Sequence, residues 1–428
     1  MNPPIDYKAL KNRNILCVDM KSFYASCAAL VKGLDPLTAH LAVVADTKRK
    51  GSVVLAATPA LKRDFGIRTG NRVFEIPADE NIVTVSAQMN LYLEVSAEIT
   101  RLFNKYVPKE VIHTYSIDES FLDVDGTEKL WGSAEEVAVR IRDELKDTFG
   151  LTATIGIGPN MLMAKLCLDL EAKQSGIARW TYTDIPNKLW PVTPLSRMWG
   201  IGSRLEKRLH RMGISTVGQL ANYSLPRLEK TFGVIGSQLY YHANGIDLSE
   251  LGAPILQGQV SYGKSQVLLR DYHHPQDVAY VILEMCEEVA QRARANRQAG
   301  RTIHLGIGYS QEEGGGGFYR SITMESPTNI TMEMYRACMY LFRKFYAHQT
   351  VRKISLSLDQ VCDDDAVQLD LFTRNRMRER KLGYAMDAVR KKHGQDALLR
   401  AVSYTPAGTA RRRTQLVGGH YAESYESG

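Results

Sequence analysis

The chain has 428 residues, enough for roughly three domains, and its 44% hydrophobic and 24% charged residues are typical of a globular protein. Its net charge of +7 favours an anionic partner. The polar N-terminus lacks the features of a signal peptide and no apolar run is long enough to span a bilayer, so we expect a cytoplasmic protein without a membrane segment. None of the six cysteines forms a C-x-x-C pair, which argues against a zinc site and predicts reduced thiols.

Acidic residues lie in or at the end of two short apolar stretches. Residues 14–18 have the form of a buried strand that ends at Asp19, and residues 111–124 are predicted to form a hairpin with Asp118 and Glu119 at its tip. An isolated Asp-Glu pair is most often a solvated turn, but a third acid at the end of a neighbouring strand favours a site. Carboxylates on two adjacent strands offer the hard oxygen ligands that Mg²⁺ prefers, and two such ions promote in-line phosphoryl transfer.

Basic and helical segments surround these strands. Residues 25–89 are basic and turn-rich, and the helix end predicted at Gly66 carries Arg63 in its last turn, where the helix dipole alone explains a cation. The next predicted elements are two helices and a strand, over 90–106, 134–149 and 152–158. Lys165 and Lys173 follow on a helix-like segment, where isolated lysines are usually solvated.

Two glycine-bearing motifs come next. Trp199-Gly200-Ile201-Gly202 and the helical pattern after it are typical of a helix-hairpin-helix, in which Gly200 and Gly202 let backbone N–H groups approach a DNA phosphate. Residues 258–265 match the P-loop expression, but the residues after Lys264 and Ser265 read as a strand, whereas a P-loop requires a helix there. We therefore interpret Lys264 and Ser265 as contacts to a DNA phosphate.

The remaining chain is predicted to contain one further domain and a tail. Residues 258–366 follow the order β-α-β-β-α-β of a ferredoxin-like domain, with basic residues that are candidates for phosphate contact: Arg301, Arg320, Arg352 and Lys353. The pentapeptide Gln368-Leu369-Asp370-Leu371-Phe372 is either an alternating strand or an extended peptide that fills an apolar groove. The tail is basic, with a helix that ends near Gly394 and an arginine run, 411–413, that is solvated or binds DNA.

At the acidic residues the chain resembles a known family. Residues 19–26 (Asp-Met-Lys-Ser-Phe-Tyr-Ala-Ser) and 116–119 (Ser-Ile-Asp-Glu) look like the two metal-binding motifs of the Y-family, translesion DNA polymerases, in the same order and at a fitting separation. The likeness extends from about Ile15 to Phe372 and is closest to the bacterial UmuC-like and UvrX-like branch. It implies a low-fidelity, DNA-directed DNA polymerase without proofreading that adds dNTPs to a primer 3′-hydroxyl with two Mg²⁺ ions.

The resemblance also assigns roles to single residues. The metal ligands and catalytic residues would be Asp19, Asp118 and Glu119, with the backbone carbonyl of Met20 as a further ligand. The incoming nucleotide would be bound by Phe23, by the steric gate Tyr24, by Arg63 and by Lys173, while Lys165 would lie near the active site. Ala60 stands where several members carry a phosphate-binding tyrosine, which puts the full triphosphate clamp in doubt.

The implied architecture and partners follow from the same family. The fold class is α/β, in the form of an α+β multidomain right-hand polymerase. Its domains would be a ferredoxin-like palm (1–24 and 90–180), small fingers (25–89), a helical helix-hairpin-helix thumb (181–247), a linker (248–257) and a little finger (258–366), followed by the clamp-binding motif and basic tail (367–428). Its partners would be primer-template DNA, dNTPs, accessory proteins of the SOS response and the bacterial sliding clamp, the last bound through Gln368, Leu369, Leu371 and Phe372. The alternatives are a catalytically weak adaptor that links DNA to the clamp and, from the P-loop match, a repair ATPase.

Overall fold

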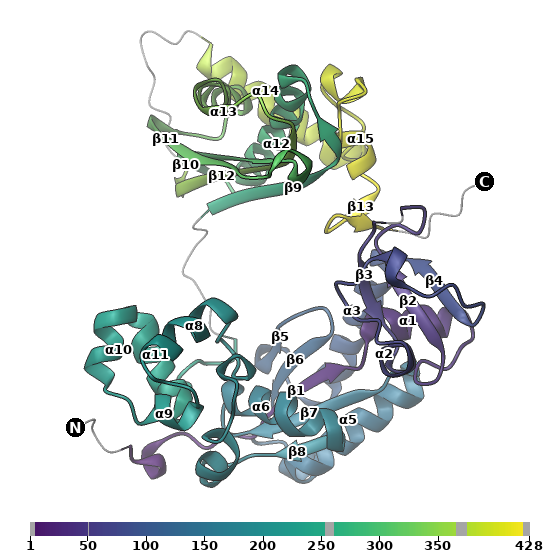
Figure 1. The fold of residues 1–428 in the computed structure, drawn as a ribbon, viewed down its shortest axis with the longest axis vertical. Helices are drawn as coiled ribbons and strands as arrows, with labels where there is room; N and C mark the ends of the chain where they lie inside the picture. Colours follow the sequence, from purple (N-terminus) through teal and green to yellow (C-terminus); the bar gives the residue numbers. More distant parts are fainter. Residues whose placement is uncertain (1–4, 50, 253–260, 365–374, 423–428) are drawn as a thin grey trace. The chain divides into compact units, whose positions relative to one another are not determined.

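The computed structural model describes residues 5–49, 51–252, 261–364 and 375–422 of the chain (Figure 1). The chain divides near residue 253 into two compact units, and the last described strand, β14 (His420–Tyr421), belongs to the first unit. Within the described ranges, no helix combines the length and the apolar character that crossing a bilayer requires.

The first unit is built on a five-stranded sheet in the order β5-β6-β1-β7-β8. Its strands are β1 (Ile15–Met20), β5 (Ile112–Thr114), β6 (Glu119–Asp123), β7 (Ala153–Gly158) and β8 (Ile177–Arg179). The central strand β1 runs antiparallel to both β6 and β7. The buried strand expected before Asp19 and the strand expected over 152–158 are therefore confirmed.

Glycines in β7 allow a helical segment to lie directly on this sheet. The segment consists of α6 (Met161–Cys167), η4 (Leu168–Ala172) and α7 (Lys173–Ser175). A Cβ atom built on Gly156 would overlap the backbone of this segment at Ala164. The close approach explains how a lysine on α6 reaches the strands below it.

The other elements of the first unit surround this core. A second sheet has the order β3-β2-β4, made by β2 (His40–Val44), β3 (Val54–Ala57) and β4 (Ile82–Ser86). The helices are α1 (Phe23–Val31), α2 (Pro59–Asp64), α3 (Met89–Tyr106), α4 (Glu128–Trp131), α5 (Ala134–Phe149), α8 (Ser203–Arg211), α9 (Val217–Ala221), α10 (Leu225–Phe232) and α11 (Val234–Ala243). Short helical turns lie at η1 (Tyr7–Ala9), η2 (Val73–Glu75), η3 (Lys109–Val111), η5 (Tyr182–Asp184), η6 (Ile185–Leu189) and η7 (Leu195–Arg197).

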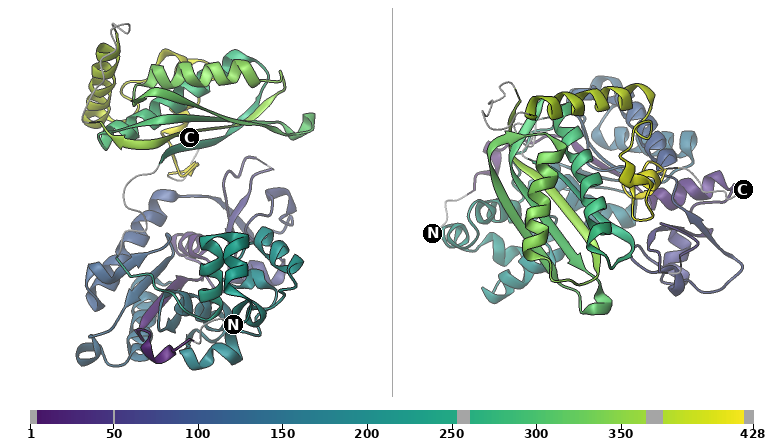
Figure 2. Two further views of the ribbon diagram at one scale, coloured as in Figure 1. Left: turned by 90° about the vertical axis from the view of Figure 1, so that its left-hand side faces the viewer. Right: turned by 90° about the horizontal axis from the view of Figure 1, so that it is seen from above.

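The second unit has the predicted order β-α-β-β-α-β, with α12 and α13 on one face of its sheet (Figure 2). In chain order the elements are β9 (Ser261–Tyr272), α12 (Pro275–Ala295), β10 (Gln298–Tyr309), η8 (Gln311–Glu313), β11 (Gly317–Thr328), α13 (Thr331–Phe345) and β12 (Val351–Asp363). The strands pair in the order β11-β10-β12-β9. Lys264 and Ser265 lie inside β9, so no helix follows them and the rejection of a P-loop is confirmed.

A C-terminal segment is joined to α12 of the second unit by buried charges. It contains α14 (Arg376–His393), η9 (Ala401–Tyr404), α15 (Ala410–Arg413) and β13 (Leu416–Val417), and Gly394 ends α14 as predicted. Arg294 of α12 is buried and its Nε lies 2.6 Å from Oδ2 of Asp387, while Nη1 of Arg390 lies 3.1 Å from Oε1 of Glu287. Removing one partner of such buried pairs typically costs about 3–5 kcal/mol, so this segment is an integral part of the unit.

Candidate active site

The strand register brings two of the three predicted acids together. Asp19 of β1 is paired directly with Glu119 of β6, and the backbone N–H of Met20 donates to the carbonyl of Asp118 over 2.9 Å. Residues opposite one another on antiparallel strands point to the same face, so the carboxylates of Asp19 and Glu119 share one face of the sheet. Asp118 lies in the adjoining turn, where Ser116 donates to its Oδ1 over 2.6 Å.

The hairpin differs from the expectation at one residue. Asp118 and Glu119 were expected together at the tip of the hairpin, but β6 begins at Glu119 and this residue is buried, with 7% of its surface exposed. Its Oε2 accepts a hydrogen bond from Nζ of Lys165 over 2.8 Å, and its Oε1 accepts one from Sγ of Cys17 over 3.2 Å. Burial lowers the pKa of Lys165, but the hydrogen bond and the charge of Glu119 outweigh it and raise the pKa overall. Glu119 is therefore held in place by a buried contact with Lys165.

Asp19 occupies a different electrostatic environment. Burial is the largest cause that raises the pKa of Asp19, to about 6, and the carboxylate of Asp118 raises it further, while Lys173 opposes both. Lys173 lies near Asp19 because Asp169 holds it: Nζ of Lys173 is 2.7 Å from Oδ1 of Asp169, and Nζ of Lys165 is 3.3 Å from Oδ2 of the same residue. Charges of alternating sign thus run from Glu119 to Asp19 along the α6–α7 segment.

The donor atoms of these acids fit Mg²⁺ in their chemistry. Carboxylate oxygens are the donors that Mg²⁺ prefers, and a dication would relieve the raised pKa of Asp19. Among the residues that the structure describes, however, no three acidic, histidine or cysteine side chains are grouped closely enough to hold a metal. Asp118 lies near enough to Asp19 to raise its pKa, whereas Glu119 would become available to a cation only by giving up its hydrogen bond from Lys165.

The predicted steric gate, Tyr24, lies near the acid cluster formed by Asp19, Asp118 and Glu119 and packs on Tyr92. The ring of Tyr24 stacks on Tyr92 with 4.3 Å between centroids and 15° between planes, and the charge of Asp118 raises the pKa of Tyr24 in addition to the larger effect of burial. Phe23 is buried, with its ring 5.9 Å from that of Tyr24. Such a stack covers one face of each ring and so restrains the orientation of Tyr24. Tyr92 was not singled out from the sequence, since one tyrosine on a helical pattern carries no local signal.

The two basic residues of α2 have different partners. Arg63 is exposed and donates to both carboxylate oxygens of Asp64, over 2.7 and 3.0 Å, so its charge is already paired. The preceding residue, Lys62, is half-buried and its Nζ lies 2.7 Å from Oγ of Ser22. Ala60 is fully buried and offers no phosphate ligand. Lys62 was passed over in the sequence because the helix dipole explained both cations equally well.

The other predicted contacts are placed as follows. Gly200 has a φ of +91° and Gly202 is the N-cap of α8, next to Trp199, whose ring packs on Tyr115 of the acidic hairpin at 5.7 Å. Lys264 belongs to the second unit and its Nζ is 2.7 Å from Oε1 of Glu288. The clamp-binding candidates Gln368, Leu369, Leu371 and Phe372 lie outside the described residues.

Three family descriptions match the chain in order. Residues 18–169 match the impB/mucB/samB family, residues 197–247 the thumb domain of DNA polymerase iota, and residues 259–371 the C-terminal domain of the impB/mucB/samB family.

Similar proteins match over nearly the whole length. A Bacillus subtilis (strain 168) protein named UvrX is 60% identical over 97% of this chain and 99% of its own. DNA polymerase IV 2 of the same organism is 36% identical over 96% of this chain and 100% of its own, and DNA polymerase IV of Pelotomaculum thermopropionicum is 36% identical over 93% and 97%. A solved chimera of the Y-family DNA polymerases Dbh and Dpo4 shares the fold, with a TM-score of 0.63, 20% identity and coverage of 82% of this chain and 99% of that one. The chain belongs to the impB/mucB/samB family, that is, to the Y family of DNA polymerases.

Proposed function

We propose that the chain is a cytoplasmic translesion polymerase that adds dNTPs to a primer 3′-hydroxyl, with Asp19, Asp118 and Glu119 at its reacting centre. Membership of the family makes it a DNA-directed DNA polymerase; the proposal concerns the residues that carry the reaction. The observation that supports it most is the pairing of Asp19 with Glu119 across two strands that are separated by about a hundred residues in the sequence, with Asp118 adjacent.

The residues around this centre have separate tasks in the proposed reaction. Mg²⁺ bound to Asp19 and Asp118 would neutralise charge on the triphosphate and promote ionisation of the 3′-hydroxyl. Lys173 provides a cation beside Asp19, at the position where phosphate charge develops during transfer. Tyr24, supported by Tyr92, provides a fixed wall for the sugar and would exclude a 2′-hydroxyl.

A primer-extension assay with Mg²⁺ tests the assignment. Wild type should extend the primer, and Asp118→Asn should lose activity by on the order of a thousandfold, because it removes one charge at the reacting centre. Asp147→Asn, an exposed change on α5, is the matched control and should keep wild-type activity. Activity that survives Asp118→Asn would reject the site.

Recruitment and fidelity belong to the same proposal. We infer from the sequence that the segment 368–372 binds the bacterial sliding clamp, and that SOS accessory proteins are further candidate partners. Addition of a clamp should increase extension by wild type but not by a variant with Leu371 and Phe372 replaced by alanine. A low-fidelity enzyme should also extend primers opposite damaged template bases and misinsert frequently on intact templates.

A further inference from the structure

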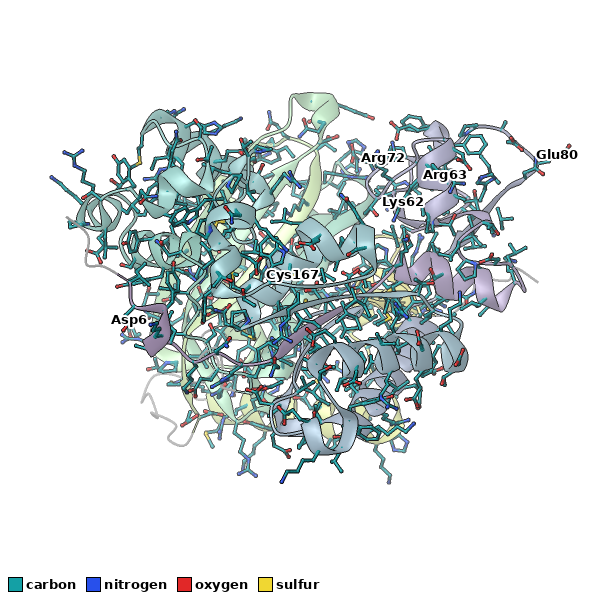
Figure 3. All side chains as sticks on the ribbon, turned by 90° about the horizontal axis from the view of Figure 1, so that it is seen from below. Asp6, Lys62, Arg63, Arg72, Glu80 and Cys167 are labelled. Atoms are coloured by element: carbon teal, nitrogen blue, oxygen red, sulfur yellow. The ribbon has the colours of Figure 1, made fainter. Side chains whose placement is uncertain are left out.

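Lys62 lies at the acid cluster without an acidic partner of its own. Its Nζ donates to the neutral Oγ of Ser22 over 2.7 Å, and among the described residues no carboxylate forms an ion pair with it. Figure 3 marks Lys62 and Arg63 as neighbours on α2; in contrast to Lys62, Arg63 is paired with Asp64. The charge of Lys62 is therefore the one that α2 leaves available.

The sequence of α2 explains this orientation. Pro59 stands at its first turn, the helix has six residues, and Ala60 and Leu61 are both fully buried. With these two side chains fixed in the core, Lys62 is half-buried next to Ser22, while Arg63, one position further around the helix, is exposed.

Ser22 connects β1, which carries Asp19, to the helix that carries the steric gate Tyr24. Its φ of +52° places it in the left-handed region, at the turn between β1 and α1, two residues before Tyr24. An ammonium has three donors, so Lys62 can hold Ser22 with one N–H and still present two to a ligand.

The surroundings of Lys62 are positively charged. Burial is the main reason that the pKa of Lys62 is lowered, and Lys21, Lys173 and Arg68 lower it further, while Asp19 acts in the opposite sense. Three cations and one acid, Asp19, act on Lys62, and the repulsion among the cations would be relieved by a further anion bound beside them. A triphosphate carries several negative charges and is the substrate class that this cluster fits.

We propose that Lys62 binds the β- and γ-phosphates of the incoming dNTP, opposite Lys173, and supplies the phosphate donor that Ala60 cannot. This inference rests on the proposed function, and it assigns to Lys62 the contact that the family resemblance gave to Arg63. A lysine serves this purpose as a compact charge that needs no bidentate geometry.

Single-nucleotide insertion kinetics test the proposal. Lys62→Met keeps the length of the side chain and removes its charge, so the KM for dNTP should rise by about tenfold to a hundredfold with a smaller change in kcat, as expected for loss of a hydrogen bond to a charged group. Lys62→Arg should restore most of the affinity. The concentration of inorganic pyrophosphate that halves activity should rise in Lys62→Met in the same proportion.

Lys146→Met is the matched control, because it removes the charge of an exposed lysine on α5. It should leave the KM for dNTP and the pyrophosphate inhibition within about twofold of wild type. A KM rise in Lys146→Met equal to that in Lys62→Met would overturn the proposal, as would an unchanged KM in Lys62→Met or a larger rise in Arg63→Met. If wild type fails to extend a primer at all, the proposed function fails together with this inference; an active wild type with an unaffected Lys62→Met rejects the inference alone.

Discussion

Replacing Asp19 by asparagine should stabilise the metal-free protein while it abolishes polymerisation. Burial and the neighbouring acids raise the pKa of Asp19 from 3.8 to about 6. A carboxyl group whose pKa is higher in the folded state is destabilising when ionised, so at pH 8 the charge opposes folding. At about 1.4 kcal/mol per pKa unit, this shift corresponds to a penalty of at most about 3 kcal/mol.

The pH dependence of the free energy of unfolding follows from the direction of the pKa shift of Asp19. The penalty is fully present above pH 6, because Asp19 is then ionised in both states. It decreases as pH falls from 6 towards 3.8, where the folded state is protonated first, and it vanishes below that value. The difference in stability between Asp19→Asn and wild type should therefore be largest at pH 8 and about half as large at pH 5.

Thermal unfolding with a chelator present measures this difference. For a unit of this size, 1 kcal/mol corresponds to about 2–4 °C, so Asp19→Asn should raise Tm by several degrees and by no more than about 12 °C at pH 8. Mg²⁺ should raise the Tm of wild type more than that of the variant, since a ligand stabilises only the state that binds it. The exposed change Asp147→Asn is the control. A variant that is no more stable than wild type at pH 8, or a difference that does not shrink at pH 5, would refute the reasoning.

Three other changes probe the surroundings of the site. Lys165→Met leaves the buried Glu119 without its cation and should lower the free energy of unfolding in urea by about 3 kcal/mol or more, and adding Glu119→Gln should recover part of that loss; no recovery would mean that the pair is not coupled. Gly156→Ala places a methyl group against the backbone of Ala164, so it should destabilise by about 3 kcal/mol and reduce activity, and a neutral result in the same urea titration would contradict the close packing. Tyr24→Ala should increase the use of rNTP relative to dNTP by about tenfold or more in insertion assays, whereas an unchanged ratio would remove Tyr24 from the gate.

The backbone order was predictable where local pattern and tertiary packing agree. The alternation of apolar residues gave the β-α-β-β-α-β order of the second unit, and the apolar run that ends at Asp19 gave the central strand β1. The chemistry of the three acids suggested that Asp19 meets the hairpin and the family resemblance supported it, but no spacing rule pairs strands that are so far apart in sequence.

Side-chain partners were less predictable. Glu119 was expected beside Asp118 at the tip of the hairpin, but it is the buried first residue of β6 and is bound by Lys165, because Gly156 allows the helix to approach β7. Similarly, the different environments of Lys62 and Arg63 depend on how the buried residues of α2 anchor the helix. Two adjacent basic residues in a sequence do not reveal this difference.

The buried ion pairs of α12 have a practical consequence for shortened versions of this polymerase. A protein truncated at the end of β12 would retain Arg294 and Glu287 in an apolar interior and lose Asp387, Arg390 and the further partner of Glu287, Arg400. Arg294 and Glu287 would keep the contact between them, 3.6 Å from Nη2 to Oε1, but they would lose the one carboxylate and two guanidinium groups that complete this buried network, and the loss would destabilise the helix that packs on the sheet. Truncations made to isolate the catalytic portion should end before β9 or continue past Arg413, since any boundary between these points divides a single folding unit.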